Sequence, residues 1–407
     1  MMIEIALGSL LIIVLILALA LGLLAVRALL VPDIALSVSV NGGQVIPAKR
    51  GAKLLEVLHG AGIAVPAACG GSGTCGQCRV IVTGEGAGEL RSTERGLLSA
   101  RERRDHVRLA CQLNLRGPVE VTVGPEILSA ETFACTVASN RMLAPLIREL
   151  VLELPAQHDL KFRAGSFMLL TAPPYERDFS RLDVEAEHQL TWRISGWESL
   201  RAQASERTTR AYSLASRPED RGRVVFNIRL AVPPAGQEAE IPPGVVSSYL
   251  FGLEPGDSID VSGPFGDFHV QPTEREMVFV GGGVGMAPLR AMIHEQLGQG
   301  TQRPISYFYG ARARADLFYV EEFEQLAASH ANFNWTVALS DPSPGDRWHG
   351  PTGFVHEVLL KALGSHPAPE DCEYYLCGPP VMISAVLSAL DQLGVEPHSI
   401  FNDDFGS

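Results

Sequence analysis

The residues with the most specific spacing in this chain are four cysteines. Three of them share one glycine-rich loop, Cys69-Gly-Gly-Ser-Gly-Thr-Cys75-Gly-Gln-Cys78, and Cys111 follows thirty-three positions later. Four thiolates in this arrangement can enclose a [2Fe-2S] cluster, because small residues between them let the backbone approach and point N–H groups at the sulfurs. The plant-type pattern has four and then two residues between its first three cysteines. This loop has five and then two, which enlarges the first interval without removing a ligand.

A zinc site is the alternative for the same four thiols. Structural zinc usually combines two Cys-x2-Cys knuckles, whereas only Cys75 and Cys78 form one here, so the spacing favours iron–sulfur. The other cysteines, Cys135, Cys372 and Cys377, lie far apart, and the odd total of seven indicates a reducing compartment rather than a disulfide framework. We expect Cys135 and Cys372 to be ordinary buried residues.

A second group of residues offers the contacts that a flavin dinucleotide needs. In Arg210-Ala-Tyr-Ser213, an Arg and a Ser on one strand can hold a phosphate, and the Tyr between them can face a flat ring. Farther along, Gly244-Val-Val-Ser247 can begin a helix whose first amides meet a pyrophosphate. Taken alone, Arg-x-Tyr-Ser is more often an ordinary strand with a buried Tyr. The candidate FAD contacts are Arg210, Tyr212, Ser213, Gly244, Val246 and Ser247.

A third group is typical of a site for a nicotinamide nucleotide. The stretch Gly281-Gly-Gly-Val-Gly-Met-Ala-Pro288 joins a buried strand to a helix, where free amides can receive phosphates, although it does not match G-x-G-x-x-G and a tight turn is the alternative. Cys377 ends a late strand, where the reactive ring would lie, which makes it a catalytic candidate. The candidate nucleotide contacts are Gly282, Gly283, Val284, Gly285, Gly378 and Pro379.

The elements around these motifs divide the 407 residues into four parts. We expect a transmembrane anchor at 1–30, an α+β β-grasp ferredoxin domain at 33–126, an antiparallel β-barrel flavin domain at 130–270, and an α/β parallel-sheet nucleotide-binding domain at 273–407. A polar insertion at 173–209 interrupts the strands of the barrel.

The N-terminal segment and the charge of the chain limit its surroundings. Ile5 to Val26 contains no charge and is long enough to cross a bilayer as a helix. A cleaved signal peptide is the alternative, but Glu4 stands in front instead of a basic cluster. Arg27 follows the segment and places the remaining residues in the cytoplasm by the positive-inside tendency. The net charge of -13 argues against nucleic acid as a partner.

In this order, the motifs resemble the ferredoxin-reductase family, whose members hold FAD in the barrel and a nicotinamide nucleotide in the sheet domain. With the ferredoxin-like loop, one membrane helix and the closing Asp403-Asp-Phe-Gly406, the whole chain resembles the NADH-oxidising subunits of membrane sodium-translocating NADH:quinone oxidoreductases. The resemblance implies that NADH gives hydride to FAD, and that single electrons pass to the [2Fe-2S] cluster, to other membrane subunits of the complex and indirectly to quinone. It also implies a single-pass protein of the bacterial inner membrane, with its catalytic domains on the cytoplasmic side.

The same resemblance assigns Phe405 to the flavin face that the nicotinamide must reach, while Asp404 lies beside that site or is solvated. It implies NADH, although Arg312 and Arg314 could grip a 2′-phosphate and favour NADPH. Two other functions use the same modules: the soluble reductase component of an oxygenase, and a membrane-tethered zinc-binding module without turnover. One helix without internal charge cannot conduct sodium, so any transport belongs to partner subunits.

Overall fold

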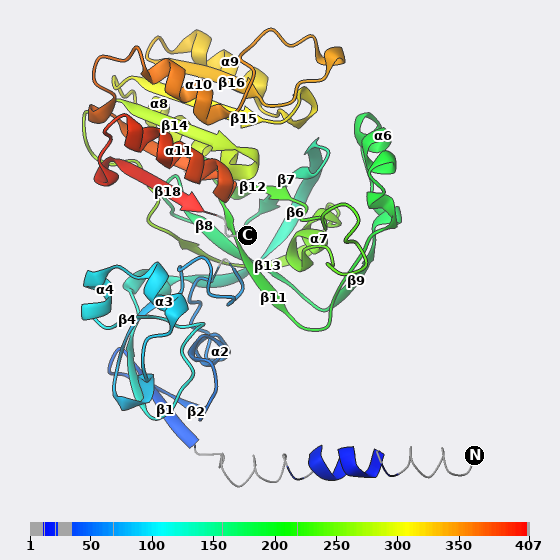
Figure 1. The fold of residues 1–407 in the computed structure, drawn as a ribbon, viewed down its shortest axis with the longest axis vertical. Helices are drawn as coiled ribbons and strands as arrows, with labels where there is room; N and C mark the ends of the chain where they lie inside the picture. The colour runs from blue at the N-terminus through cyan, green and yellow to red at the C-terminus, as the bar shows by residue number, and fades with distance from the viewer. Residues whose placement is uncertain are drawn as a thin grey trace.

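The structure, a computed structural model, describes residues 11, 13–20, 22, 35–67, 69–156, 158–217 and 219–404. From residue 35 onward, these residues build three successive bodies that contact one another (Figure 1). The predicted membrane segment Ile5–Val26 lies largely outside the described residues. Within the described part of the chain, no helix has the length and apolar character needed to span a membrane.

The first body is a mixed five-stranded sheet with short helices, in the order β2-β1-β5-β3-β4. β1 runs parallel to β5, and the other neighbours are antiparallel, which is the β-grasp arrangement that we predicted. Asn41 and Gly42 both have positive φ, which suits the tight Asn-Gly turn that joins β1 to β2. The elements are β1 Ala35–Val40, β2 Gln44–Lys49, α2 Leu54–Gly60, β3 Arg79–Thr83, α3 Ser92–Leu97, α4 Ala100–Arg104, β4 Val107–Leu109 and β5 Val119–Thr122.

The second body is an antiparallel barrel. Its six strands follow the order β11-β8-β13-β6-β7-β12, and an antiparallel bridge between Leu214 and Phe226 joins the two edges of this sheet. Alternate strand residues such as Leu150, Leu152 and Val261 fill its core. The elements are α5 Pro125–Ser129, β6 Glu131–Ala144, β7 Ile147–Glu153, β8 Phe167–Ala172, β11 Thr208–Ser213, β12 Arg223–Arg229, α7 Val245–Phe251 and β13 Ser258–Phe265.

The insertion at 173–209 adds buried residues to the barrel core, which its polar sequence does not indicate. β9 (Tyr175–Asp178) and β10 (Arg201–Ala204) pair as a ribbon, and α6 (Ala186–Ile194) lies beyond it at the edge of the molecule (Figure 1). Trp192 is fully buried, stacks on Phe251 of α7 at 6.2 Å between ring centroids, and donates its indole N–H to Pro145 O at 2.6 Å. The insertion therefore braces the helix that the sequence assigned to pyrophosphate binding.

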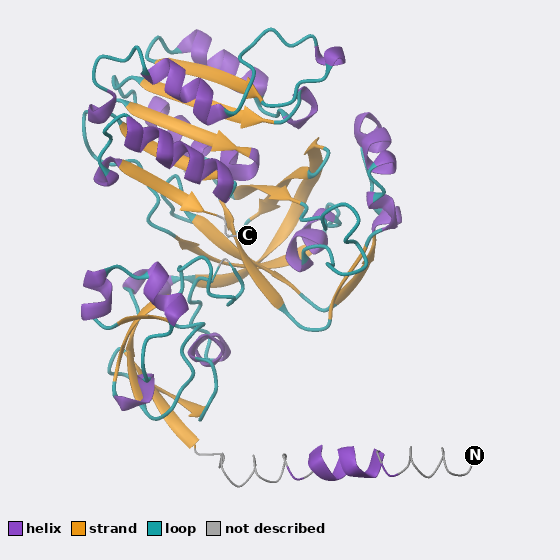
Figure 2. Ribbon diagram, in the orientation of Figure 1, coloured by secondary structure: helices purple, strands orange, loops and turns teal. Residues whose placement is uncertain are grey.

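The third body is a fully parallel sheet in the order β16-β15-β14-β17-β18, with helices on both faces (Figure 2). Met277 and Phe279 of β14 pack on the face of α8 and α9, whereas Val278 and Val280 pack on the face of α10 and α11. The elements are β14 Met277–Gly282, α8 Met286–Gly298, β15 Ile305–Ala311, α9 Val320–Ser329, β16 Phe333–Leu339, α10 Val355–Leu363, β17 Glu373–Gly378, α11 Pro380–Gln392 and β18 Ile400–Asp404.

The order of the parallel strands reverses next to β14, because β15 lies on one side of it and β17 on the other. Ligands of open α/β sheets bind at such a switch point, outside the carboxyl ends of the strands. β14 and β17 end at Gly282 and Gly378, the two glycine-containing motifs of the sequence. The α/β parallel sheet predicted for this body is confirmed.

Candidate functional site: a cysteine loop, a flavin strand and a nucleotide turn

The four predicted cluster cysteines come together between α2, β3 and β4. Cys69 and Cys75 are partly exposed, whereas Cys78 and Cys111 are buried. Cys75 Sγ lies 3.3 Å from Cys69 Sγ, which is far beyond the roughly 2.05 Å of a disulfide. Four glycines of the loop have positive φ, which side chains rarely adopt, so glycine is needed for this path. They are Gly70, Gly71, Gly73 and Gly76.

The thiols perturb one another strongly. The hydrogen bond from Cys75 lowers the pKa of Cys69 to about 2, while the same bond and burial raise the pKa of Cys75. In the second pair, the interaction with Cys111 raises the pKa of Cys78, and the interaction with Cys78 lowers the pKa of Cys111. In each pair one sulfur ionises more easily than the other, because two adjacent negative charges repel. A bound cation would allow all four sulfurs to ionise.

Backbone and amide N–H groups also reach these sulfurs. Gln77 N–H donates to Cys75 Sγ at 3.5 Å, and Gln112 Nε2 donates to Cys111 Sγ at 3.5 Å. Such donors stabilise thiolates around an iron–sulfur cluster and tune its potential. An all-sulfur donor set in two close pairs, with N–H donors aimed at it, fits a [2Fe-2S] cluster.

β11 carries the predicted flavin residues, and the cysteine loop lies directly against it. A Cβ placed on Gly70 would stand 2.1 Å from Nη1 of Arg210, so the guanidinium occupies the space that a side chain would take. Arg210 Nη1 also donates to Thr209 O at 2.8 Å. Nearby, Ala64 of the first body packs with Phe167, Leu169, Phe265 and Ala211 of the barrel. The cysteine loop and the flavin strand are thus neighbours.

The opposite end of β11 meets the third body. Ser213 is buried, and its hydroxyl donates to Asp403 Oδ2 at 3.4 Å across 190 positions of sequence. Tyr212, between the two contacts, packs on the barrel core with part of its ring accessible. Asp403 lies in β18, one residue before Asp404, which pairs with Gly378 of β17. Phe405, predicted to cover the flavin, lies outside the described residues.

The start of α7 explains the second flavin motif. A Cβ on Gly244 would approach Ser247 Oγ to 2.7 Å and Ala231 Cβ to 2.8 Å, so this position accepts only glycine without rearrangement. Ser247 Oγ donates to Gly244 O at 3.1 Å and accepts from Ala231 N–H at 3.2 Å. Val246 is 2% exposed in the barrel core, so only its backbone can face a ligand. Tyr175 of the insertion donates its hydroxyl to Val245 O, a contact that the sequence did not reveal.

The glycine-rich turn after β14 is pressed against the end of β17. A Cβ on Gly285 would stand 2.0 Å from Cys377 O, and a Cβ on Gly282 would stand 2.7 Å from Met382 Sδ. Gly283 has φ +56°, a Cβ placed on it would meet nothing within 4 Å, and its carbonyl oxygen accepts a hydrogen bond from the Tyr309 hydroxyl at 3.1 Å. Cys377 itself is fully buried. The turn and the Cys377 strand end, both predicted from sequence, therefore form one surface.

Two further candidate nucleotide contacts, Val284 and Pro379, lie in or beside this turn. Val284 packs partly into the core between the sheet and α8, and Pro379 stands immediately before α11, with its Cδ at 3.5 Å from the Cβ position of Gly282. Both flank the strand ends where a nucleotide would lie. Arg312 and Arg314, considered for a 2′-phosphate, are exposed: Arg312 pairs with Asp341 at 3.2 Å and Arg314 donates to Asp346 O at 2.9 Å.

A polar network that sequence reasoning missed joins the barrel to the nucleotide sheet. Tyr319, at the start of α9, has φ +58°; its hydroxyl donates to Glu149 Oε2 at 2.5 Å and accepts from Asn227 at 2.9 Å. The guanidinium of Arg290 lies 4.6 Å above the Tyr319 ring and donates to Ala215 O at 2.6 Å. Ala215 follows the flavin strand, so α8 is tied directly to it. These partners are far apart in sequence, and no local signal marks them.

Glu276, His366 and Cys372 form another group of possible metal ligands among the described residues. Ala368 N–H donates to Nδ1 of His366, which leaves the ring proton on Nε2, where it is donated to Glu276 at 3.1 Å. The three side chains are therefore satisfied by hydrogen bonds. Cys372 and Cys135 are buried as predicted, and burial raises the pKa of Cys135 to about 12.

Three family models match the chain in the order of its three bodies. Residues 38–116 match the 2Fe-2S iron-sulfur cluster binding domain, residues 176–270 match the oxidoreductase FAD-binding domain, and residues 279–388 match the oxidoreductase NAD-binding domain. The first contains all four cluster cysteines, the second contains β11 and α7, and the third contains the glycine-rich turn and Cys377.

Curated relatives match along the full length, and each is the component designated F of a Na(+)-translocating NADH-quinone reductase. The protein of Methylococcus capsulatus is 44% identical over 407 residues, covering 100% of each chain. Its namesake in Psychrobacter arcticus is 46% identical over 388 residues, covering 94% of each chain. Sequence identities of 44% and 46% over at least 94% of each chain are sufficient to assign a chain to a protein family.

Solved structures agree with the fold. The cytochrome P450 reductase GcoB of Amycolatopsis has a TM-score of 0.63 at 27% identity, over 91% of this chain and 98% of its own. The ferredoxin reductase in carbazole 1,9a-dioxygenase has a TM-score of 0.59 at 23% identity, over the same shares. The second likeness is one of fold alone.

Proposed function

Because the chain belongs to the family of F components of Na(+)-translocating NADH-quinone reductases, we propose that it is the electron-input subunit of such a complex. It is an oxidoreductase with a 2Fe-2S domain, an FAD-binding domain and an NAD-binding domain. A bound FAD would supply hydride acceptance from NADH and a bound cluster would supply single-electron transfer, so the two groups together would convert a two-electron donor into single-electron transfers. The residues of this chain bind and orient these groups.

The observation that carries this proposal is that β11 contacts both of the other bodies. Arg210 lies against Gly70 of the cysteine loop, and Ser213 contacts Asp403 of the nucleotide sheet. Three residues of a strand span about 10 Å. A flavin held along β11 would therefore lie within short reach of both its electron donor and its electron acceptor.

The ligands of the cluster are Cys69, Cys75, Cys78 and Cys111. The close approach of the sulfurs, 3.3 Å between Cys69 Sγ and Cys75 Sγ, supports this assignment, since metal binding displaces thiol protons. The N–H groups that reach Cys75 and Cys111 would lower the energy of the ionised sulfurs.

The flavin contacts come from β11 and α7. Arg210 and Ser213 bind the flavin phosphate and Tyr212 packs on the isoalloxazine. Backbone groups of Gly244, Val246 and Ser247 approach the pyrophosphate. The tight packing at Gly244, which holds the start of α7 in place, supports the last assignment.

The nucleotide contacts come from the ends of β14 and β17, at the backbones of Gly282, Gly283, Val284, Gly285, Gly378 and Pro379. NADH phosphates would meet the open turn at Gly283. Cys377 and Phe405 border the place where nicotinamide meets flavin. NADH is the substrate, and a higher kcat/KM with NADPH would overturn that preference.

Membership of the same family also supports a proposal for the partners and the membrane location of the protein. Its partners are the other membrane subunits of the complex, with quinone reduced indirectly through them. Residues 5–26 form a single membrane span in the bacterial inner membrane, and Arg27 keeps the catalytic domains in the cytoplasm. Membrane extraction would test this placement: release of the full chain by carbonate or high salt would contradict a spanning anchor.

One second function has an observation in its favour. The reductase component of an oxygenase would use the same three bodies, and the solved reductase of Amycolatopsis shares the fold at 27% identity. The 44% identity to the quinone reductase component of Methylococcus capsulatus over the full chain favours the quinone reductase. An isolated, fully soluble full-length chain that reduces an oxygenase, but no quinone, would reverse this preference.

Cys75→Ala tests the division of labour. Removing one cluster ligand is expected to abolish electron transfer to quinone, while NADH oxidation with a two-electron dye stays nearly intact, because flavin and nucleotide bind elsewhere. Cys135→Ala is the matched control, since Cys135 is a buried barrel residue. Iron, sulfide and FAD contents of each protein accompany the rates. Retained quinone reduction in Cys75→Ala would refute the cluster assignment.

Arg210→Leu tests the flavin clamp. The variant is expected to lose FAD and both activities, because leucine cannot make the charge-assisted hydrogen bonds to phosphate. Stoichiometric FAD in the purified variant would contradict the assignment.

A further inference from the structure

The charge of the chain is divided unevenly between its bodies. Residues 33–126 carry eleven Lys and Arg against nine Asp and Glu, a formal charge of +2. Residues 1–32 carry no net charge. Because the whole chain carries -13, residues 127–407 carry -15. The body that holds the cysteine loop is therefore the only basic part of a strongly acidic chain.

The positive charges gather around α3 and α4. Between residues 89 and 116 there are seven Arg against four Asp and Glu. Glu94 is buried with Arg108, Glu102 pairs with Arg79 at 2.9 Å, and Asp105 lies 3.7 Å from Arg101. Six exposed arginines of this body make no ion pair with a described residue, and we call them the arginine face: Arg50, Arg91, Arg95, Arg103, Arg104 and Arg116.

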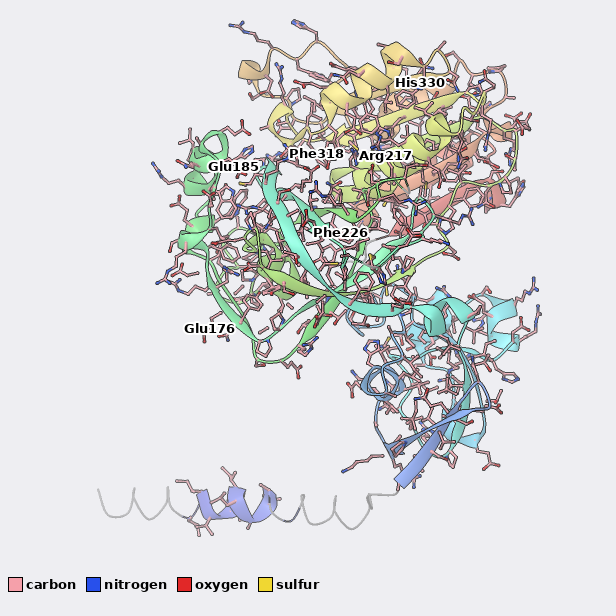
Figure 3. All side chains as sticks on the ribbon, turned by 180° about the vertical axis from the view of Figure 1, so that it is seen from behind. Glu176, Glu185, Arg217, Phe226, Phe318 and His330 are labelled. Atoms are coloured by element: carbon pink, nitrogen blue, oxygen red, sulfur yellow. The ribbon has the colours of Figure 1, made fainter. Side chains whose placement is uncertain are left out.

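A hollow enters this face next to the cluster. It has a volume of about 530 Å³, and Arg50, Arg91 and Arg116 line it together with Gln112. Arg91 also stands immediately before α3, so the hollow and the helices form one surface. Side chains that end in nitrogen protrude from this outer edge in Figure 3, and the same edge lies away from the barrel in Figure 1.

Hydrogen bonds connect α3, the helix that carries Arg95 of the arginine face, to the cysteine loop and to Cys111. Thr93 of α3 donates to Gln112 Oε1 at 3.1 Å, and the amide of Gln112 donates to Cys111 Sγ. On the other side, Arg79 donates to Gly76 O of the cysteine loop and to Leu97 O of α3 at 3.1 Å. The cysteine loop thus has two neighbours: the flavin strand, through Gly70, and the arginine face, through Gln112 and Arg79.

We propose that the arginine face is the docking surface for the next electron carrier, an acidic one-electron redox protein of the same complex. This inference rests on the proposed function, and it names the surface and the chemistry of the partner. One electron leaves the reduced cluster and one oxidised centre of the partner gains it. No covalent bond forms or breaks, and no proton moves. Opposite charges across such a surface steer encounter and select orientation, and salt screens them.

The alternatives for this surface differ in what they require. The acidic bodies of the same chain leave the six arginines exposed in the structure, so they do not cover the surface. An anionic lipid headgroup would also attract arginines, but lipid binding does not require the surface to lie close to the sulfurs. The link through Gln112 to Cys111 therefore favours a redox partner.

The test uses the full complex in detergent. The triple variant Arg95→Glu, Arg103→Glu and Arg104→Glu is compared with Lys161→Glu, Arg347→Glu and Lys361→Glu, which change the charge equally at exposed positions of the acidic bodies. We expect NADH-to-quinone turnover at low ionic strength to fall roughly tenfold in the first variant only, with a flattened salt dependence. NADH oxidation by a dye, FAD content and iron content stay at wild-type values in both.

A second readout does not depend on turnover. Phenylglyoxal modifies exposed arginines, and mass spectrometry locates the products. Arg95, Arg103 and Arg104 are expected to react in the isolated full chain and to be protected in the complex, while Arg347 reacts in both.

The outcomes separate the two proposals. Wild-type turnover and salt dependence in the triple variant, or full reactivity of the three arginines in the complex, would overturn the docking surface and leave the proposed function intact. Protection by phosphatidylglycerol nanodiscs without partner subunits would also overturn it, in favour of lipid. A wild-type protein in which NADH does not reduce flavin and cluster would instead refute the proposed function.

Discussion

Replacing Gly285 by alanine should separate nucleotide geometry from cofactor binding. The added Cβ would lie 2.0 Å from the carbonyl oxygen of Cys377 and 2.7 Å from the amide nitrogen of Gly378. Ordinary contacts begin near 3.4 Å, so the turn and the end of β17 must part by about 1.4 Å. All of the crowded atoms belong to backbone of a central parallel strand, so no flexible side chain can move aside.

The displacement acts where nicotinamide and flavin must be aligned. A misplacement of about 1 Å can cost roughly 100-fold in rate, so we expect the rate of flavin bleaching by NADH to fall by about two orders of magnitude. Overpacking itself should destabilise the protein by about 1–3 kcal/mol. FAD and iron contents should not change, because β11 and the cysteine loop lie outside the displaced region.

Stopped-flow absorption at saturating NADH measures this step, and a melting curve measures stability. Gly298→Ala, at the end of the same helix with nothing within 4 Å of the new Cβ, is the control and should keep the wild-type rate. Flavin bleaching in Gly285→Ala at the wild-type rate and KM would show that the contact between the turn and β17 does not position the nucleotide.

Two other substitutions probe how the bodies are held. Tyr319→Phe removes the hydrogen bonds with Glu149 and Asn227, and it should lower the free energy of unfolding by about 1–3 kcal/mol in urea denaturation; an unchanged midpoint would contradict a role for the hydroxyl. Glu94→Gln breaks a buried pair with Arg108 and should cost about 3–5 kcal/mol at pH 7. Burial raises the pKa of Glu94, but Arg108 and backbone donors outweigh it and hold this pKa below 4.5, so the stabilisation exists above pH 4.5 and fades below it. The difference in melting temperature from wild type should therefore shrink in acid, and a constant difference would refute the ion pair.

Local patterns were sufficient for most of the nucleotide sheet. A buried strand followed by glycines and a helix has few alternatives, and the strand and helix predicted on either side of the Gly281–Pro288 stretch are observed as β14 and α8. The same holds for the cysteine loop, where glycines with positive φ let the chain turn back and Cys75 Sγ lies 3.3 Å from Cys69 Sγ. In such segments the chain carries its own geometric constraints.

The insertion shows where this reasoning stops. Its sequence is polar on average, yet Trp192 is fully buried against Phe251, and Tyr175 bonds to the start of α7. The side of α6 that faces the barrel and the orientation of Tyr175 depend on partners about 60 to 70 positions away in sequence. The periodicity of the local sequence does not indicate these partners. The same limit applies to Tyr319 and Arg290, whose partners lie on other bodies.

The contact between Ser213 and Asp403 combines residues that the sequence indicates with a proximity that only the fold determines. The sequence indicated both residues separately, one in a flavin motif and one in the closing segment, but only the parallel pairing of β18 with β17 brings them together. Asp403 lies in β18, so its contact with Ser213 depends on the pairing of β18 with β17. Arg210 at the other end of the same strand depends only on the first body. Loss of β18 should therefore disturb the entry of electrons from NADH while leaving the contact between flavin strand and cysteine loop in place.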